Sequence, residues 1–529
     1  MSSDPDLHGV EIHDTTLRDG TQREGISLSC DDKLRIAERL DALGVHVIEA
    51  GFPGSNPKDA EVFRRARDMQ WKHAQIAAFG STRRAAIHVE DDPGLRTLLE
   101  AETPACVIFG KSSGMQVEVV LRTSLDENLR MIEESIAFLR AAGRRVIYDA
   151  EHFFDAFVAD EAYALETLRA AVRGGADTVV LCDTNGGALP WQIERAVRDA
   201  QAVVPVRLGI HAHNDSGCAV ANSLAAVRAG ARHVQGTVNG YGERCGNADL
   251  CAVIPGIELK LGLRALPEGG LRELYDCSRF VAEIANLAHD PHEPYVGRSA
   301  FAHKGGTHVA AVRLAPETYQ HVDPVSVGNQ SRVVVSELSG RANVRSKAEE
   351  LGIVVEGDLD RQVVQEIKDR EAAGASFEAA EGSVALMLRR RAPGYRAPFR
   401  VLAFQVLASK RDSGASVSEA TIKIEIGGTV VHTAAEGVGP VGALDAALRK
   451  ALTSAHPAAA QIRLVDYKVR ILDGRDGTAA VTRVLVDSSD GTHNWSTVGA
   501  APSILDASLA ALADGYEFGL LGLETREVA

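Results

Sequence analysis

The sequence predicts an α/β protein built on a (β/α)8 TIM barrel, and three observations lead to this fold. Eight short apolar runs rich in β-forming residues recur roughly every 26 to 40 residues through the first half of the chain. Segments with helical periodicity separate the runs, and strands that alternate with helices pair in parallel. Charged and polar side chains gather where the runs end, as they do at the C-terminal face of a barrel. This polarity favours the barrel over an open doubly wound sheet.

The eight predicted strands follow one another within the first half of the chain. In order they are GVEIHD (9–14), VHVIEAG (45–51), AQIAAFG (74–80), ACVIFG (105–110), RRVIYDAEH (144–152), DTVVLCDTN (177–185), VRLGIHAHND (206–215) and RHVQGTVNG (232–240). The segments between them are rich in Ala, Leu, Glu and Arg. One of these helices opens with Ser124 and carries Glu127 three residues later, which predicts a capping box.

Two further regions follow the barrel, which we expect over residues 8–285. Residues 286–398 combine helical stretches with the loop GRSAFAHKGGTHVAAV and predict a linker subdomain rather than a ninth barrel unit. Residues 399–525 carry long, partly alternating strands and an internal repeat. GTVVHTAAEGVGPVGALDAALRKAL resembles GTHNWSTVGAAPSILDASLAALADG, so we expect an α+β domain with a duplicated β-α unit. No acid/base or metal cluster occurs in it, which indicates a binding or dimerising role, with catalysis elsewhere.

Composition excludes several classes of protein. The net charge of −15 argues against a nucleic-acid partner, because polyanions select basic surfaces. No apolar run approaches the ~20 residues of a membrane span, and the N-terminus lacks the features of a signal peptide. The seven cysteines are scattered without a CxxC pair, which indicates free thiols. We therefore expect a cytoplasmic protein.

The triplet HAH is the strongest chemical signal in the sequence. Side chains alternate across a strand, so His211 and His213 point to one face at the end of the seventh strand. Two adjacent imidazoles suit a metal better than a core, and Asp19 after the first strand supplies a third ligand. Positions would stay open for substrate oxygens. The mixed O/N set suits Mn²⁺, Zn²⁺, Co²⁺ or Mg²⁺ alike.

Three more strand-end residues favour an anionic substrate, and each also has a structural alternative. Arg18 suits a carboxylate or a developing oxyanion, the alternative being a surface salt bridge. Glu151 is a candidate for catalysis or for the support of a metal-bound histidine. Thr184 can hydrogen-bond a substrate carboxylate or cap a helix.

With these residues assembled, the chain resembles a known family along its whole length. LRDGTQ, HAHND and GERCGN occur in the order found in the metal-dependent barrels that include 2-isopropylmalate, homocitrate and citramalate synthases. LRDGTQREGISLS, GFPGSNPKDAEVF and YDAEHFFDAF look closest to the long-form citramalate branch. LRDG alone would be a weak signal, whereas the ordered set is specific.

The resemblance implies a Claisen-type condensation by an acyltransferase. Acetyl-CoA would condense with the ketone of a small α-keto acid, and water would cleave the thioester. In the citramalate branch the acceptor is pyruvate and the product, (R)-citramalate, leads to isoleucine. The nearest alternative is a 2-isopropylmalate synthase, with 2-oxoisovalerate as acceptor in leucine biosynthesis. A metal-dependent C–C lyase or aldolase is a further alternative, because related barrels use the same metal triad.

The resemblance also assigns roles around the metal. Asp19, His211 and His213 would hold the divalent ion, and Asn247 would add an oxygen. Arg18 would stabilise the charge that builds on the keto oxygen.

Three further residues follow from the resemblance at the barrel mouth. Thr184 would bind the substrate carboxylate, and Glu151 would take part in substrate binding or catalysis. Gln22 would lie near the incoming substrates.

The subdomain supplies the remaining expected residues. His308 and Tyr319 match a histidine and a tyrosine that reach over the active site, often from the partner subunit, and perform acid/base chemistry there. Several relatives place an acidic residue two positions after the histidine, where this chain has Ala310. His303 is therefore a competing candidate for the base.

The tail resembles the regulatory and dimerisation domain of these synthases. The resemblance implies a homodimer and feedback binding of an end-product amino acid, isoleucine in the citramalate branch.

Overall fold

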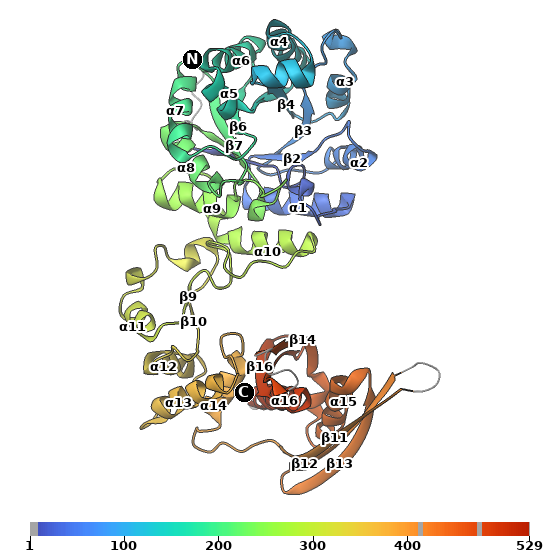
Figure 1. The fold of residues 1–529 in the computed structure, drawn as a ribbon, viewed down its shortest axis with the longest axis vertical. Coiled ribbons are helices and arrows are strands. Elements are labelled where there is room, and N and C mark those ends of the chain that lie inside the picture. Colours follow the sequence, from blue (N-terminus) through green and yellow to red (C-terminus); the bar gives the residue numbers. More distant parts are fainter. Residues whose placement is uncertain (1–8, 411–415, 473–478, 528–529) are drawn as a thin grey trace. The chain divides into compact units, whose positions relative to one another are not determined.

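The computed structural model describes residues 9–410, 416–472 and 479–527 (Figure 1), so position 8, the expected start of the barrel, lies outside the described residues. The chain divides into two compact units. The first runs through Phe301 and includes Val322–Gln330, and the second holds Ala302–His321 and the chain from Ser331 onward. Each unit has its own hydrophobic core.

The first unit is the predicted barrel: eight parallel strands close into one ring, in which β1 pairs with both β2 and β8. The strands are β1 (Glu11–Asp14), β2 (Val47–Gly51), β3 (Gln75–Ser81), β4 (Ala105–Lys111), β5 (Arg145–Glu151), β6 (Thr178–Asp183), β7 (Arg207–Ala212) and β8 (His233–Gly236). All eight coincide with the apolar runs of the sequence, so the predicted fold class is confirmed.

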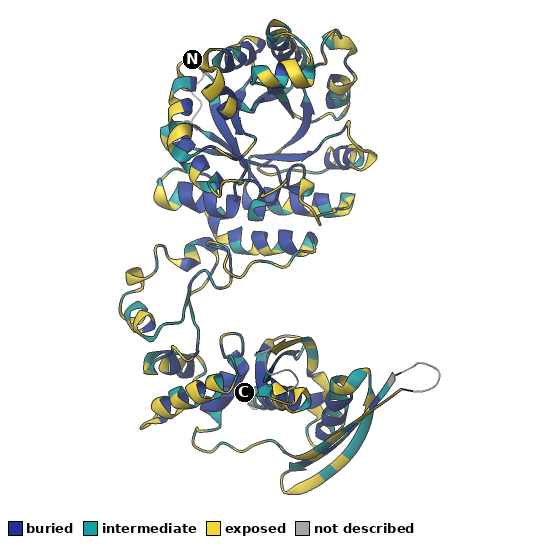
Figure 2. Cartoon of the chain, in the orientation of Figure 1, coloured by how far each residue is buried: buried dark blue, intermediate teal, exposed yellow. Residues whose placement is uncertain are grey.

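Helices surround the ring and bury their apolar faces against it (Figures 1 and 2). They are α1 (Cys30–Leu43), α2 (Pro57–Ala66), α3 (Pro93–Glu100), α4 (Leu125–Ala141), α5 (Phe153–Ala159), α6 (Glu161–Gly174), α7 (Pro190–Gln201), α8 (Ala219–Ala229), α9 (Leu250–Pro255) and α10 (Leu274–Ile284). Local signals fix their ends. For α1, Ser29 and Asp32 form a capping box, and Gly44 ends the helix at φ 98°, a conformation that favours glycine.

The capping box predicted for α4 is only half formed. Ser124 accepts a hydrogen bond from the backbone N–H of Glu127, as predicted. The Glu127 carboxylate accepts hydrogen bonds from Arg83 and Arg130 instead of from the backbone of Ser124. Two guanidinium groups compete successfully with one backbone amide for a carboxylate, because charge-assisted hydrogen bonds are the stronger ones.

The inside of the barrel is divided between apolar and polar layers. Val47, Ala77, Val107, Ile147 and Val180 belong to a small apolar cluster separate from the main core. Polar side chains occupy the other layers, from Glu11 and His233 at the N-terminal ends of β1 and β8 to residues nearer the C-terminal ends of the strands. Seven such residues are buried: Glu11, His13, Glu49, Asp149, His211, His233 and Gln235. Buried polar groups need partners, so these layers indicate a built site rather than a packed core.

The second unit contains the expected duplication. Two three-stranded antiparallel sheets are each followed by one helix, in the order β11-β12-β13-α15 and β14-β15-β16-α16 (Figure 1). Their bounds are β11 (Arg400–Lys410), β12 (Ser416–Ile426), β13 (Thr429–Gly437), α15 (Gly439–Thr453), β14 (Arg463–Ile471), β15 (Thr482–Ser489), β16 (Asn494–Ala501) and α16 (Ile504–Glu527). Before them come β9 (Ala302–His303), α11 (Gly306–Leu314), β10 (Arg332–Val333), α12 (Arg341–Glu350), α13 (Leu359–Ala372) and α14 (Glu381–Arg389).

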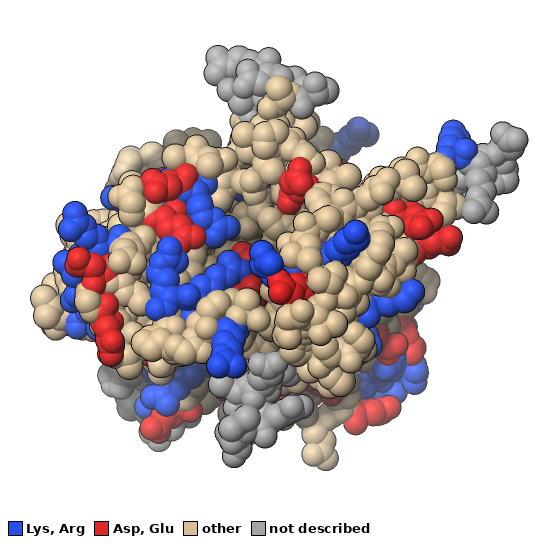
Figure 3. All heavy atoms as spheres, turned by 90° about the horizontal axis from the view of Figure 1, so that it is seen from below, with Lys and Arg blue, Asp and Glu red and all other residues tan. Residues whose placement is uncertain are grey.

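Two surface properties bear on the expected partners. Among the described residues, no helix combines the length and apolar character needed to cross a membrane. On the face drawn in Figure 3, Lys and Arg are interspersed with Asp and Glu rather than gathered into one broad basic patch. The coloured residues on this face therefore present no broad basic surface to a nucleic acid, in line with the net charge of −15.

Candidate active site and metal centre

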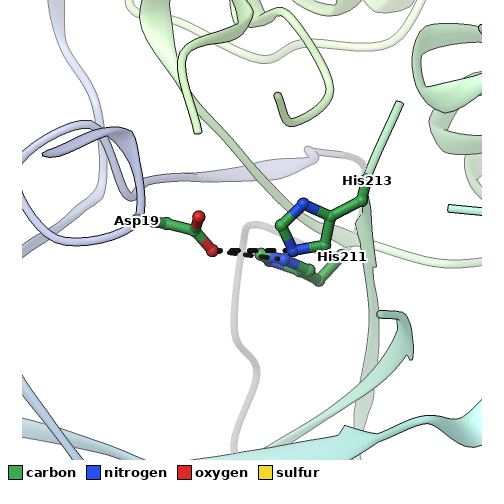
Figure 4. Close-up of side chains that lie close together, drawn as sticks. All are labelled: Asp19, His211 and His213. Carbon is green, nitrogen blue, oxygen red and sulfur yellow. Dashed lines mark ion pairs between the residues drawn. The ribbon is translucent and has the colours of Figure 1, made fainter. Parts of the chain in front are cut away.

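Asp19, His211 and His213 form a buried cluster at the C-terminal end of the barrel strands. Their ligand atoms all lie within 4.8 Å of one another, and the residues are 2%, 5% and 6% exposed. Nε2 of His211 lies 3.6 Å from Oδ2 of Asp19, and Nε2 of His213 lies 3.8 Å from the same oxygen. Figure 4 shows the carboxylate and both imidazoles turned toward one point. One aspartate and two histidines are an ordinary donor set for a divalent metal.

The loop after β1 places Asp19, and Arg18, which we expected at the strand end, lies on the same loop. The strand ends at Asp14, so Arg18 and Asp19 lie on the following loop rather than at the strand end itself. The side chain of Asp14 accepts hydrogen bonds from the backbone and hydroxyl of Thr16. This turn fixes the path of the loop, as aspartate commonly does in turns. It thereby brings Asp19 next to the end of β7.

Hydrogen bonding fixes the orientation of His211. Its Nδ1 lies 2.9 Å from Oε1 of Gln235, which can only accept, so Nδ1 carries the proton and Nε2 faces Asp19. Gln235 in turn donates to Oδ1 of Asp149 over 2.8 Å. Burial, aided by His213, lowers the pKa of His211 to about 4. The imidazole is therefore neutral at neutral pH, as a metal ligand must be.

The protonation of Asp19 also suits a cation. Burial alone would raise its pKa, but Arg18 and the two imidazoles outweigh burial and lower the pKa to about 2. Oδ1 of Asp19 and Oδ1 of Asn247 are buried and accept no hydrogen bond from any described residue. Asn247 bridges to His213 through the backbone and is 2% exposed. Leaving such acceptors unpaired costs free energy, so these oxygens fit a bound cation.

Arg18 is held on three sides beside this cluster. Its Nε donates to Oε1 of Glu49 over 2.5 Å, and its Nη1 lies 3.1 Å from Oδ2 of Asp19. Its guanidinium lies 3.9 Å from the ring centroid of Phe79, a cation–π contact. Burial would lower the pKa of Arg18, but Glu49 and Asp19 raise it, so the cation is permanent. The alternative of a surface salt bridge does not describe this buried guanidinium.

A cavity of about 440 Å³ opens above the cluster. Seven of the predicted residues line it: Arg18, Asp19, Gln22, Glu151, Thr184, His211 and His213. Its apolar wall is built from Phe52, Phe79 and Phe109, whose rings stack or meet edge to face. A cation site, a fixed arginine and an apolar wall in one cavity suit a small acid with a short apolar group.

Thr184 and Glu151 each have a partner at the cavity wall. Oγ1 of Thr184 accepts from the backbone N–H of His152 over 2.8 Å, which leaves the hydroxyl hydrogen available to another acceptor. Glu151 forms an ion pair with Lys111 at the end of β4. Arg244 donates to the carbonyl of Thr184 over 2.8 Å and so joins the loop after β8 to this wall.

The remaining predicted residues belong to the second unit. The rings of His308 and Tyr319 stack with centroids 4.2 Å apart and an interplanar angle of 28°. Nε2 of His303 lies 3.2 Å from Nε2 of Gln320, the residue after Tyr319. The structure thus brings these side chains together with one another, as it brings Asp19 together with the two histidines in the first unit.

Sequence reasoning missed the residues that support the site. Glu49, Asp149 and Gln235 hold Arg18 and His211, yet none of them stands at a strand end. A signal was present, because a glutamate inside VHVIEAG and a glutamine inside RHVQGTVNG interrupt apolar strands. A polar residue there must face a partner inside the barrel.

Three family models match consecutive parts of the chain. The HMGL-like model matches residues 9–281, the homocitrate synthase post-HMGL domain-like model matches 295–374, and the LeuA allosteric (dimerisation) domain model matches 378–520. The last of these covers most of the duplicated tail.

Curated relatives match nearly the full length of the chain. An (R)-citramalate synthase of Geobacter sulfurreducens is 49% identical over 97% of this chain and 97% of its own. An (R)-citramalate synthase of Synechocystis is 52% identical over 96% of each. A probable 2-isopropylmalate synthase of Methanopyrus kandleri is 33% identical, over 96% of this chain and 97% of its own.

Proposed function

This chain belongs to the HMGL-like family, and on that premise we propose that it is an acyltransferase that makes (R)-citramalate. Acetyl-CoA, pyruvate and water would give (R)-citramalate and CoA, a step toward isoleucine. Near-full-length identity of about half to curated (R)-citramalate synthases supports this reading. The 33% identity of the 2-isopropylmalate synthase makes leucine biosynthesis the weaker candidate.

One observation carries the chemistry: Asp19 links the permanent cation of Arg18 to the two histidines. Its Oδ2 lies 3.1 Å from Nη1 of Arg18, 3.6 Å from His211 and 3.8 Å from His213. Asp19, His211, His213 and Asn247 would hold a divalent ion, Mn²⁺, Mg²⁺, Zn²⁺ or Co²⁺. When bound, that ion supplies Lewis-acid stabilisation to the oxygens of an α-keto acid. Arg18 then donates hydrogen bonds to the negative charge that develops on the keto oxygen.

The cavity wall would orient the keto acid. Thr184 already accepts from the backbone of His152, so its hydroxyl can donate to the substrate carboxylate. Glu151, paired with Lys111, presents its carboxylate to the same cavity. Gln22 lies in the lining and would bind a polar group of an incoming substrate. When the keto oxygen and the carboxylate of a small acid are both held in place, only one face of its ketone is open to attack.

Bond making requires a base for acetyl-CoA. We assign this role to His308, which stacks on Tyr319, with His303 as the competing candidate. The base takes a proton from the acetyl methyl group, and the methyl carbon forms a bond to the keto carbon of pyruvate. The former keto oxygen gains a proton, and water then cleaves the thioester to release CoA. The assignment requires the segment of His308 to reach a barrel mouth, from the same chain or from a partner subunit.

The apolar wall supports pyruvate as the acceptor. Phe52, Phe79 and Phe109 line the cavity beside Arg18 and limit the room for the alkyl group of the keto acid. Pyruvate offers a methyl group, whereas 2-oxoisovalerate offers an isopropyl group. Each methylene in such a pocket changes discrimination by only about 1–3 kcal/mol, so the preference is measurable rather than absolute.

The tail would bind an effector and a second copy of the chain. Its match to an allosteric dimerisation domain supports a homodimer, and we propose isoleucine as the effector. A cavity of about 660 Å³ at the start of α15 combines Val441 and Leu464 with Asp445 and Arg463, groups that suit an amino acid. Gly442 lines this cavity, and a Cβ added there would meet no other atom, so Gly442→Leu should fill the cavity without a clash. We expect this variant to show no heat of isoleucine binding in calorimetry. Unchanged heat would contradict this location.

A thiol-release assay tests the proposed reaction. Full-length protein with acetyl-CoA should release CoA fastest with pyruvate, compared with 2-oxobutanoate and 2-oxoisovalerate, and citramalate should be identified by mass spectrometry. A faster rate with 2-oxoisovalerate would favour the leucine pathway instead. Cleavage of 3-hydroxy-3-methylglutaryl-CoA, without condensation, would favour a lyase.

A further inference from the structure

A row of buried side chains runs inside the barrel toward Arg18 and has no part in the reaction described so far. Oε2 of Glu11 lies 2.7 Å from Nδ1 of His233, and Nε2 of His233 lies 3.2 Å from Nδ1 of His13. Nε2 of His13 then faces Oε2 of Glu49 at 3.5 Å. Glu11 is 8% exposed and the other three are 0% exposed. Three pairs of facing atoms therefore lie along the row. Each pair, here called a gap, can share one proton.

Both ends of the row are ionised carboxylates. Glu11 is paired with Arg145 at 2.6 Å and with Arg207 at 2.9 Å, and Glu49 is paired with Arg18. Burial would raise the pKa of either carboxyl group. For Glu11 the hydrogen bond from His233 and the pairing with Arg145 outweigh burial, and for Glu49 the charge of Arg18 does, so both pKa values fall below their ordinary values. Neither end can then supply a proton to its gap.

The row needs one more N–H group than two neutral imidazole rings carry. Three gaps need three N–H groups, because carboxylates only accept, and the two rings together offer four nitrogens. Two neutral imidazoles have two N–H groups between them, which would leave one gap with two facing lone pairs. Three N–H groups make the pair a single cation, flanked by Glu11 on one side and Glu49 on the other.

The contacts favour the cationic pair. Nε2 of His13 and Oε2 of Glu49 are buried and face each other at 3.5 Å, and neither has a hydrogen-bond partner among the described residues. If no proton lay between them, both acceptors would be buried without a hydrogen bond, which destabilises the fold. A positive charge on the ring pair is instead compensated by the two flanking carboxylates. Burial lowers the pKa of His233 to about 4 despite its bond to Glu11, so His233 holds a single proton, the one that its Nδ1 donates to Glu11. By the count above, the other two N–H groups of the row belong to His13.

We propose that His13 is a positioning residue: as a buried imidazolium it holds Glu49, and Glu49 holds Arg18 against the keto acid. Glu49 uses Oε1 for Nε of Arg18 and has Oε2 left for His13. Without a donor at Oε2, the Glu49 carboxylate is stabilised by turning toward another donor. The hydrogen bond from Nε of Arg18 to Oε1, which fixes the guanidinium plane, is then lost. This inference rests on the proposed function, since it assigns a consequence for turnover.

Neutron diffraction from deuterium-exchanged crystals of the full chain tests the charge directly. Deuterium on both Nδ1 and Nε2 of His13 is the expected result, with His233 carrying deuterium on Nδ1 alone. A bare Nε2 on His13 would overturn the cationic pair. The measurement needs no turnover, so it is independent of whether the wild-type chain makes citramalate.

A matched set of variants tests the consequence. His13→Gln places an amide donor near the position of Nε2, whereas His13→Asn reaches only the position of Nδ1. We expect His13→Asn to lower kcat/KM for pyruvate about tenfold to a hundredfold, as misplacement of a charge-stabilising group does, and His13→Gln to lose less than about threefold. KM for acetyl-CoA and the bound metal content should stay unchanged in both.

Two outcomes would overturn the positioning role. One is wild-type kcat/KM in His13→Asn, and the other is an equal loss in His13→Gln and His13→Asn, which simple packing would produce. Thermal unfolding of both variants checks that the barrel is intact, and the comparison between the two amides remains informative if both are destabilised. A wild-type chain that releases no CoA with any keto acid would contradict the proposed function, not the proton count.

Discussion

Arg18 and Glu49 are joined by a buried hydrogen bond of 2.5 Å between Nε and Oε1, which fixes a permanent cation beside the three candidate metal ligands. Glu49 lies in the middle of β2, whose backbone is held in the barrel on both sides. The guanidinium is therefore anchored by a rigid strand rather than by its own mobile loop. A charge fixed in advance stabilises a developing oxyanion without paying for reorganisation.

Replacing Glu49 with glutamine should lower turnover without removing the metal. Glutamine keeps an acceptor for Arg18 but loses the charge, so we expect kcat/KM for pyruvate to fall about tenfold to a hundredfold. Metal content, measured by elemental analysis, should stay at the wild-type value. Glu61→Gln, in an exposed pair with Arg64, is the matched control and should be neutral. Full activity in Glu49→Gln would show that the anchor is dispensable.

Gln235 should control metal affinity through His211. Its carbonyl accepts the Nδ1 proton of His211 at 2.9 Å, so Gln235→Leu removes the group that fixes the tautomer. We expect the dissociation constant for Mn²⁺ or Zn²⁺ to rise about tenfold to a hundredfold, the usual effect of losing such support. Competition with a chelator of known affinity measures the change. Gln330→Leu, at an exposed position, is the control, and equal affinities for both variants would contradict the role.

Glu11 should stabilise the fold in a pH-dependent way. Burial raises its pKa, but His233 and Arg145 outweigh burial and hold the pKa well below the ordinary value of 4.5. A carboxyl group with a lowered pKa stabilises the native state above its unfolded pKa, and the contribution fades as pH falls below that value. Glu11→Gln should therefore lower the free energy of unfolding by about 3 kcal/mol at pH 7.

The difference between wild type and Glu11→Gln should shrink on acidification. Below about pH 4.5 it can fall by at most about 1.4 kcal/mol for each pH unit. Urea unfolding of both proteins at pH 7, 5 and 3.5 measures this. A difference that stays constant from pH 7 to 3.5 would contradict the ionised state of Glu11.

Phe109 should contribute to the choice of keto acid. Its ring stacks on Phe79 at 5.4 Å and lines the cavity without contacting Arg18 through a cation–π pair. Phe109→Ala enlarges the apolar wall, so the ratio of kcat/KM for 2-oxoisovalerate to that for pyruvate should rise about tenfold or more. Trp191→Ala, at an exposed residue outside this cavity, should leave the ratio unchanged. An unaltered ratio in Phe109→Ala would mean that the acceptor binds elsewhere in the cavity.

The sequence carried enough information for the fold and for the metal cluster, for identifiable reasons. Eight apolar runs with helical spacers leave a parallel barrel as the simplest closure, and the alternation in HAH puts two imidazoles on one face. Asp19 could be placed nearby because the first and last strands of a barrel are neighbours.

The supporting residues could not be placed from the sequence, because their partners depend on closure and on register. His13 and His233 are 220 positions apart, and only the observed register of β1 against β8 brings their rings together. Likewise, the ion pair of Glu151 with Lys111 depends on the register of β4 against β5, which pairs these two residues directly. The second half of the capping box at Ser124 was wrongly predicted for the same reason, since Arg83 reaches the Glu127 carboxylate from a different segment.

The central claim is that Asp19 and its two histidines hold a metal ion on which citramalate synthesis depends. The most direct measurement is CoA release from acetyl-CoA and pyruvate by chelator-treated protein, before and after addition of Mn²⁺, Mg²⁺, Zn²⁺ or Co²⁺, with Asp19→Asn in parallel. The account predicts no activity in the metal-free wild type, recovery with at least one of these ions, and no recovery in a folded Asp19→Asn. Full activity in the metal-free wild type, or wild-type recovery in Asp19→Asn, would contradict it.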